Sequence, residues 1–176
     1  MARRPNLRKL ALTAHITSSV GWLGAVACFL ALSVVGLTSD EAQTVRAAYL
    51  AMEAIGWLAL APLATASLLT GLIQGLGTKW GLFRHYWVVV KLGITVVATI
   101  VLLLYLQTLS DLGKAAAEAP SRDLIDLRAP SPVLHAAAAL VLLLGATALS
   151  VYRPRGLTRY GWRKQQERTR ATSFRS

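Results

Sequence analysis

The sequence has a single cysteine, Cys28, which lies in the middle of an apolar run. One cysteine excludes an internal disulfide, and no CxxC or cysteine–histidine zinc pattern is present. Methionine is almost as scarce, with Met1 and Met52 only, so no soft-ligand cluster for copper is expected. Motifs typical of soluble enzymes, such as GxSxG, the P-loop, HExxH and the dinucleotide fingerprint, are also missing.

Acidic residues are few. The 176 residues include 8 Asp and Glu against 19 Lys and Arg, which gives a formal net charge of +11. A charge of this size indicates either nucleic acid or an anionic membrane surface as a partner. The basic residues lie just outside long apolar runs and are not interleaved with aromatic residues. Anionic lipid headgroups, contacted by the basic tail, are therefore the expected partner, and nucleic acid is not.

Long apolar segments dominate what is present, and hydrophobic residues make up 55% of the chain. Four runs exceed the roughly 18 residues that mark a membrane-spanning helix, and they cover residues 10–37, 47–76, 86–109 and 132–152. Backbone groups in hydrocarbon must pair within their own segment, so these runs are expected to be helices. The sequence predicts an all-α membrane protein, with a four-transmembrane-helix bundle in residues 1–152 and a basic cytoplasmic tail in residues 153–176.

Local features refine this prediction. Pro62 predicts a kink in the second helix, and the alanine-rich segment Gly113–Ala119 predicts a helical extension of the third. Small residues at helical spacing form one face of the second helix, where packing within the bundle is favoured over a dimer interface; they are Ala64, Ser67, Gly71 and Gly75. The tail is expected to lie on the anionic inner leaflet or to be disordered.

The distribution of charge predicts the orientation. Both tails and the loop after the second run together carry fourteen Lys and Arg, whereas the two other loops carry four. By the positive-inside rule, both termini lie in the cytoplasm and the chain is a multi-pass protein of the inner (cytoplasmic) membrane.

Ionisable residues within the runs are the candidates for function, because a charge in hydrocarbon is costly and usually marks a site. Four lie inside the runs and one lies at a boundary; they are His15, Glu53, Lys91, His135 and, less favoured, His85.

Topology sorts these residues by depth. His15 and Lys91 lie six and seven residues from the inner ends of their helices, or about 9 and 10 Å. Glu53 and His135 belong to the outer half, where Glu53 is expected to pair with His135 or with an outer-loop arginine such as Arg128. Because His15 and His135 lie in opposite leaflets, they are not expected to ligate one haem iron together.

The pair matched in depth suits haem chemistry. A neutral histidine is a good axial ligand for haem iron, and a lysine nearby is expected to serve as a sixth ligand, a base or a cation for a haem propionate. Trp22 lies on the same helical face as His15, with Ser19 between them. The sequence therefore predicts a metal ligand at His15, a catalytic or cofactor-binding role for Lys91, and a pocket that Trp22 and Ser19 line.

The segment His15–Ala25 resembles the first helix of HemJ-type protoporphyrinogen oxidases and of CopD-like membrane domains, and the segment Trp80–Lys91 resembles a later element of both. The HemJ resemblance implies b-type haem and essential roles for His15 and Lys91. The chain departs from that pattern at Phe29–Leu37, which is apolar apart from one serine where HemJ-type proteins carry a further basic and histidine-bearing stretch.

Two longer phrases, Gly77–Trp87 and Ser150–Gly161, resemble an uncharacterised actinobacterial family of four-helix integral membrane proteins, a domain of unknown function. This resemblance covers nearly the whole chain and implies no activity.

Three functions are open at this point. The first is a membrane redox protein, an oxidase in one form, that binds haem b near the inner leaflet between the first and third helices. The second is a transporter of a small ion, metal or proton that uses Glu53, His135 and Lys91. The third is a non-catalytic subunit or assembly factor, and a homo-oligomer or a membrane redox partner is expected for the chain.

Overall fold

A computed structural model describes residues 5–77, 82–154 and 156–173 of the chain. Several residues used above in the charge count or the resemblances lie outside this part; they are Arg3, Arg4, Thr78, Lys79, Trp80, Gly81, Arg155 and Arg175. The described chain is helical and contains no named strand. In chain order the elements are α1 (Pro5–Thr38), α2 (Ala42–Ile55), the π-helical turn η1 (Gly56–Leu60), α3 (Ala61–Gly77), α4 (Tyr86–Glu118), α5 (Ser131–Tyr152) and α6 (Arg159–Ser173).

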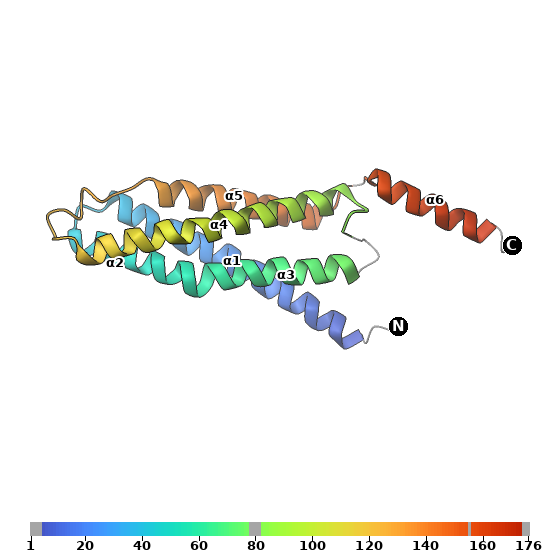
Figure 1. Cartoon of the computed structure of the whole chain (residues 1–176), viewed down its shortest axis with the longest axis horizontal. Helices are drawn as coiled ribbons and strands as arrows, with labels where there is room; N and C mark the ends of the chain where they lie inside the picture. Colours follow the sequence, from blue (N-terminus) through green and yellow to red (C-terminus); the bar gives the residue numbers. More distant parts are fainter. Residues whose placement is uncertain (1–4, 78–81, 155, 174–176) are drawn as a thin grey trace.

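Four helical segments are long and apolar enough to cross a membrane, as the sequence predicts. They are Asn6–Thr38, Ala42–Leu76, Tyr86–Glu118 and Ser131–Tyr152, each with a strongly positive mean hydropathy. The second of them joins α2, η1 and α3. The protein is therefore an all-α, multi-pass membrane protein built as a four-helix bundle (Figure 1).

The spans form a square in which each one packs against two neighbours. α1 packs against the second span and against α5, and α4 packs against the same two elements. Within the described residues α1 and α4 share no helix–helix contact, so they occupy diagonal corners. One end of the bundle carries the beginning of α1, the beginning of α4 and the start of α6, and we call it the terminal end; the opposite end, with the α1–α2 turn and the α4–α5 loop, is the loop end (Figure 1).

The second span is irregular near its middle. In η1 the N–H of Ala61 bonds to the carbonyl of Gly56, five residues earlier, where an α-helix would use a carbonyl four residues earlier. Pro62 follows directly and has no N–H with which to continue the α-helical ladder. The disruption that Pro62 predicts is thus a π-helical turn.

Helical structure continues after the predicted C-terminal ends of the third and fourth helices. α4 continues through the alanine-rich segment to Glu118, which confirms the predicted extension. Much of the basic tail is helical as α6, which projects from the terminal end away from the spans (Figure 1), so of the two expected alternatives the disordered tail is not found in Arg159–Ser173. Good helix formers after Gly161 and the ion pair between Lys164 and Glu167, three residues apart, account for this helix.

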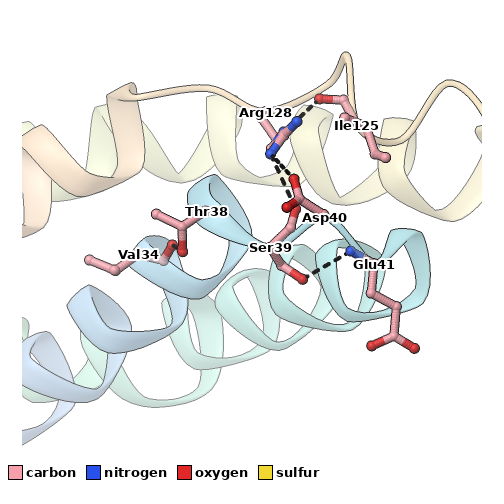
Figure 2. A network of polar contacts seen from close by, with 7 residues as sticks. All are labelled: Val34, Thr38, Ser39, Asp40, Glu41, Ile125 and Arg128. Carbon is pink, nitrogen blue, oxygen red and sulfur yellow. Dashed lines mark hydrogen bonds and ion pairs between the residues drawn. The ribbon is translucent and has the colours of Figure 1, made fainter.

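Two arginines tie the loop end together. Arg128 lies in the α4–α5 loop and donates to the carbonyls of Ile125 and Ser39 and to the carboxylate of Asp40, just after the end of α1 (Figure 2). Arg46 on α2 donates to the carbonyls of Ala117 and Ala119 at the end of α4. Cations that donate to the last carbonyls of a helix satisfy groups that have no partner within it.

The expected pairing of Glu53 with Arg128 is therefore wrong, because Asp40 and two backbone carbonyls hold the Arg128 guanidinium. The loop that carries Arg128 is itself well packed. Leu124 is fully buried, and the hydroxyl of Tyr49 accepts a hydrogen bond of 2.9 Å from the N–H of Ala129.

We expect Arg128→Ala to lower the thermal midpoint of unfolding in detergent by about 3 to 12 °C. The estimate combines about 1.5 to 3 kcal/mol for hydrogen bonds to a charged group with about 2 to 4 °C per kcal/mol for a protein of this size. The matched control is Arg122→Ala, because Arg122 belongs to the same loop, is 84% exposed and pairs only with exposed Asp123. Equal midpoints for the two variants would show that the Arg128 contacts add no stability.

Candidate functional site

His15 lies on α1 near the terminal end, and α3 fixes its ring. The ring nitrogen Nδ1 is 3.1 Å from the carbonyl oxygen of Ser67 and 3.1 Å from Oγ1 of Thr70. A carbonyl can only accept, so in the neutral ring Nδ1 carries the proton and Nε2 carries the lone pair. Among the described residues Nε2 has no hydrogen-bond partner.

Small and polar residues of α3 make this contact possible. A Cβ atom at Gly71 would lie 3.1 Å from Cε1 of His15, so a side chain there would press on the ring. The hydroxyls of Ser19 and Ser67 are 2.8 Å apart, and Gln74 donates to the carbonyl of Ala11 over 3.0 Å. The α3 face that the sequence marked as small therefore packs within the bundle, against α1, through a polar seam.

Lys91 lies on α4 at the same end of the bundle. Arg153 lies at the end of α5, also at this end of the bundle, and its Nε donates to the carbonyl of Ser150. No ion pair to Lys91 is found in the part of the chain that the structure describes. Because α1 and α4 are diagonal, a ligand that touches both His15 and Lys91 would lie across the interior of this end.

Trp22 and Ser19, which were expected to line a pocket beside His15, instead contact other residues of the bundle. Trp22 is only 2% exposed and belongs to the apolar core, together with Val26 and Phe29 of the same helix. The hydroxyl of Ser19 is shared with Ser67. In this arrangement Ser19 and Trp22 position the helix that carries His15.

The second polar site, at the loop-end half, divides into two parts. His135 on α5 stacks on the ring of Tyr105 from α4, with centroids 4.0 Å apart, and its Nδ1 lies 2.9 Å from the carbonyl of Ser131. Glu53 on α2 instead packs against α4 at Gly113, where a Cβ would overlap its carboxylate. The structure thus gives Glu53 and His135 different partners and does not bring them together.

His85 caps the start of α4. Its backbone pairs with that of Leu157, and the N–H of Thr158 donates to the carbonyl of Arg84 over 3.0 Å. Gly161 fits this junction closely, because a Cβ there would overlap the Arg84 carbonyl. His85 therefore belongs to the connection between α4 and the chain that leads into α6.

The space between the two halves is filled by apolar side chains. The core cluster that runs through the bundle includes Trp22, Val26, Phe29, Leu60 and Ala98. Two buried threonines follow Lys91 along α4, but the hydroxyls of Thr95 and Thr99 both donate to carbonyls of their own helix. The transport hypothesis requires a continuous polar path from Lys91 to His135, and the described core does not contain one.

The residues that contact the two histidines were not predicted from the sequence. Thr70 and Gln74 carry the α3 side of the seam, and Tyr105 and Ser131 surround His135. One signal was available: Ser67, Thr70 and Gln74 recur at helical spacing on α3, as do His15 and Ser19 on α1. Polar residues on one face of each helix predict that the two helices pack together, although not which atoms meet.

Comparisons with known proteins assign no role to any of these residues. Protein-family models, curated proteins and solved structures were compared with the chain, and none matches. The chemistry of the two sites therefore depends on their own side chains.

We expect Gly113→Ala to destabilise the bundle, because the new Cβ would displace the Glu53 side chain from α4. Gly93→Ala is the matched control on the same helix, since nothing lies within 4 Å of a Cβ there. Replacing an exposed helical glycine by alanine stabilises a helix by up to about 1 kcal/mol. Thermal midpoints in detergent should therefore shift in opposite directions, and the double variant Glu53→Ala/Gly113→Ala should recover much of the loss. A fall in midpoint for Gly93→Ala equal to that for Gly113→Ala would refute the Glu53 contact.

Proposed function

We propose that the chain is a haem-b-binding membrane redox protein in which Nε2 of His15 is the axial ligand of the iron. The observation that carries this proposal is the hydrogen bond between Nδ1 of His15 and the carbonyl of Ser67. Histidines that ligate metals commonly donate their other ring N–H to a carbonyl or carboxylate, which fixes the tautomer and the ring plane. The α1–α3 seam supplies that arrangement before any metal is bound.

The donor set fits haem better than it fits a bare metal ion. Within the described residues no group of three or more His, Cys, Asp or Glu side chains converges on one point. A lone histidine is sufficient for haem, because the porphyrin supplies the four equatorial nitrogens. When bound, haem would supply one-electron redox chemistry, and the protein would supply its axial ligand and its surroundings.

Lys91 and Arg153 would hold the charged edge of the porphyrin. Both are cations at the terminal end, and Lys91 has no acidic partner among the described residues. An anion that lies between two cations offsets their mutual repulsion. A haem propionate is such an anion, so we assign Lys91 to cofactor binding, which the HemJ-type resemblance of its segment also suggests.

We further infer that the terminal end faces the cytoplasm and that the chain resides in the cytoplasmic membrane. In the sequence, fourteen of the 19 Lys and Arg belong to the two tails and to the loop after the second run, and α6 carries part of this charge beyond the terminal end. The positive-inside rule places the side with more Lys and Arg in the cytoplasm.

The protein purified in mild detergent, with haem supplied during expression, should show a Soret band. His15→Ala should abolish that band, because no other described side chain replaces the anchored nitrogen. His135→Ala is the matched control, since it removes a histidine of the other half and should leave the spectrum unchanged. Lys91→Ala should weaken haem retention by about tenfold, as expected for one lost charged contact, and Lys91→Arg should restore it. An unchanged Soret band in His15→Ala, or no band in the wild-type protein, would overturn the proposal.

A further inference from the structure

A cavity of about 60 Å³ lies between α1, η1, α4 and α5, in the half of the bundle nearer the loop end. Its walls include Val26, Phe29 and Leu60, which are each less than 5% exposed, and Ala136 of α5. Its rim includes Val101, which is 45% exposed, and His135, which is also exposed. Since both rim residues belong to spans, the cavity opens sideways into the bilayer, between α4 and α5.

One polar atom at this rim is a hydrogen-bond acceptor without a donor among the described residues. Nδ1 of His135 lies 2.9 Å from the carbonyl of Ser131, which only accepts, so Nδ1 carries the proton of the neutral ring. Nε2 is left as an acceptor and has no hydrogen-bond partner among the described residues. This exposed acceptor can therefore pair with a donor that arrives along the lipid-facing side of the bundle.

The surroundings hold this acceptor in place. Tyr105 stacks on the His135 ring with an interplanar angle of 16°, and its hydroxyl is 3.1 Å from Oγ of Ser131. Ser131 therefore contacts both aromatic side chains, one through its hydroxyl and the other through its carbonyl. The π-helical turn η1 contributes Leu60 to the wall, and such turns are frequent at functional sites.

We propose that the mouth of this cavity binds a membrane-dissolved phenol or hydroquinone, with a ring hydroxyl donating to Nε2 of His135, one edge of the ring entering the cavity and any alkyl chain remaining in the lipid. The lining is apolar apart from the rim, which excludes a bulky polar headgroup. A flat ring can pack against Phe29 and Tyr105, and aromatic pairs gain from such contact. A phenolic O–H meets the lone acceptor without bringing a charge into hydrocarbon. The site goes beyond the proposed function and does not depend on haem at His15.

The test compares a probe that has hydroxyl donors with its methylated form, which has none. 2-Decyl-1,4-hydroquinone and its dimethyl ether are titrated under anaerobic conditions into the full chain in lipid nanodiscs, and binding is followed by the ¹⁵N resonances of the histidine rings. The hydroquinone should bind at least about tenfold more tightly, as expected for one hydrogen bond, and should shift Nε2 of His135. Equal affinity of the two probes for the wild-type protein would overturn the proposal.

Two variants separate the hydrogen bond from the cavity. His135→Phe keeps an aromatic ring to stack on Tyr105 but has no acceptor, so both probes should bind to it equally and weakly. Ala136→Leu fills the cavity and should remove binding of both probes, whereas Ala138→Leu, an exposed position on the same helix, should not. Retained preference for the hydroquinone in His135→Phe would overturn the assignment of the acceptor. The comparison of probes on the wild-type chain decides the proposal even where Ala136→Leu does not fold.

These outcomes are distinct from a failure of the haem proposal. The probes are titrated into the chain without haem, and His15→Ala serves as a further control that should bind the hydroquinone as the wild type does. Loss of the Soret band in His15→Ala with unchanged hydroquinone binding would support both sites independently. Loss of hydroquinone binding in His15→Ala would instead contradict the separation of the two sites.

Discussion

The absence of water in the bilayer core governs this structure, because every polar atom in a span must find its partner within the protein. Thr95, Thr99 and Thr147 meet this requirement locally, by donating to the carbonyl four residues earlier. His15 and His135 meet it at one ring nitrogen only, each through a carbonyl oxygen. The atoms left over are thereby marked as the places where a ligand can bind.

The two histidines share one hydrogen-bonding arrangement in different surroundings. In both, a carbonyl oxygen fixes the proton on Nδ1 and leaves the lone pair on Nε2. Around His15 the neighbours are the small and polar residues Ser67, Thr70 and Gly71 of α3. Around His135 they are apolar and aromatic side chains, which favour a neutral donor.

The spans and the extension of α4 could be predicted from the sequence because a hydrophobic run of sufficient length has only one backbone solution in lipid. The list of intramembrane ionisable residues was available for the same reason. The partners were not: Glu53 faces Gly113, and Arg128 is held by Asp40, because these pairings depend on the rotation of each helix and on loop conformation. Charge counts and residue depth give no information on helix rotation or loop conformation.

The π-helical turn explains why the second span escapes such reasoning. In an unbroken α-helix Glu53 and Ser67, fourteen residues apart, would point within about 40° of one another. The extra residue in η1 changes the phase by about 100°, so that the two directions differ by about 140°. One half of the span can then face α4 through Glu53 while the other faces α1 through Ser67. A single inserted residue thus gives the two halves of one span different orientations about the helix axis. An alignment that removes this residue would rotate the assigned faces of α3 by about 100°.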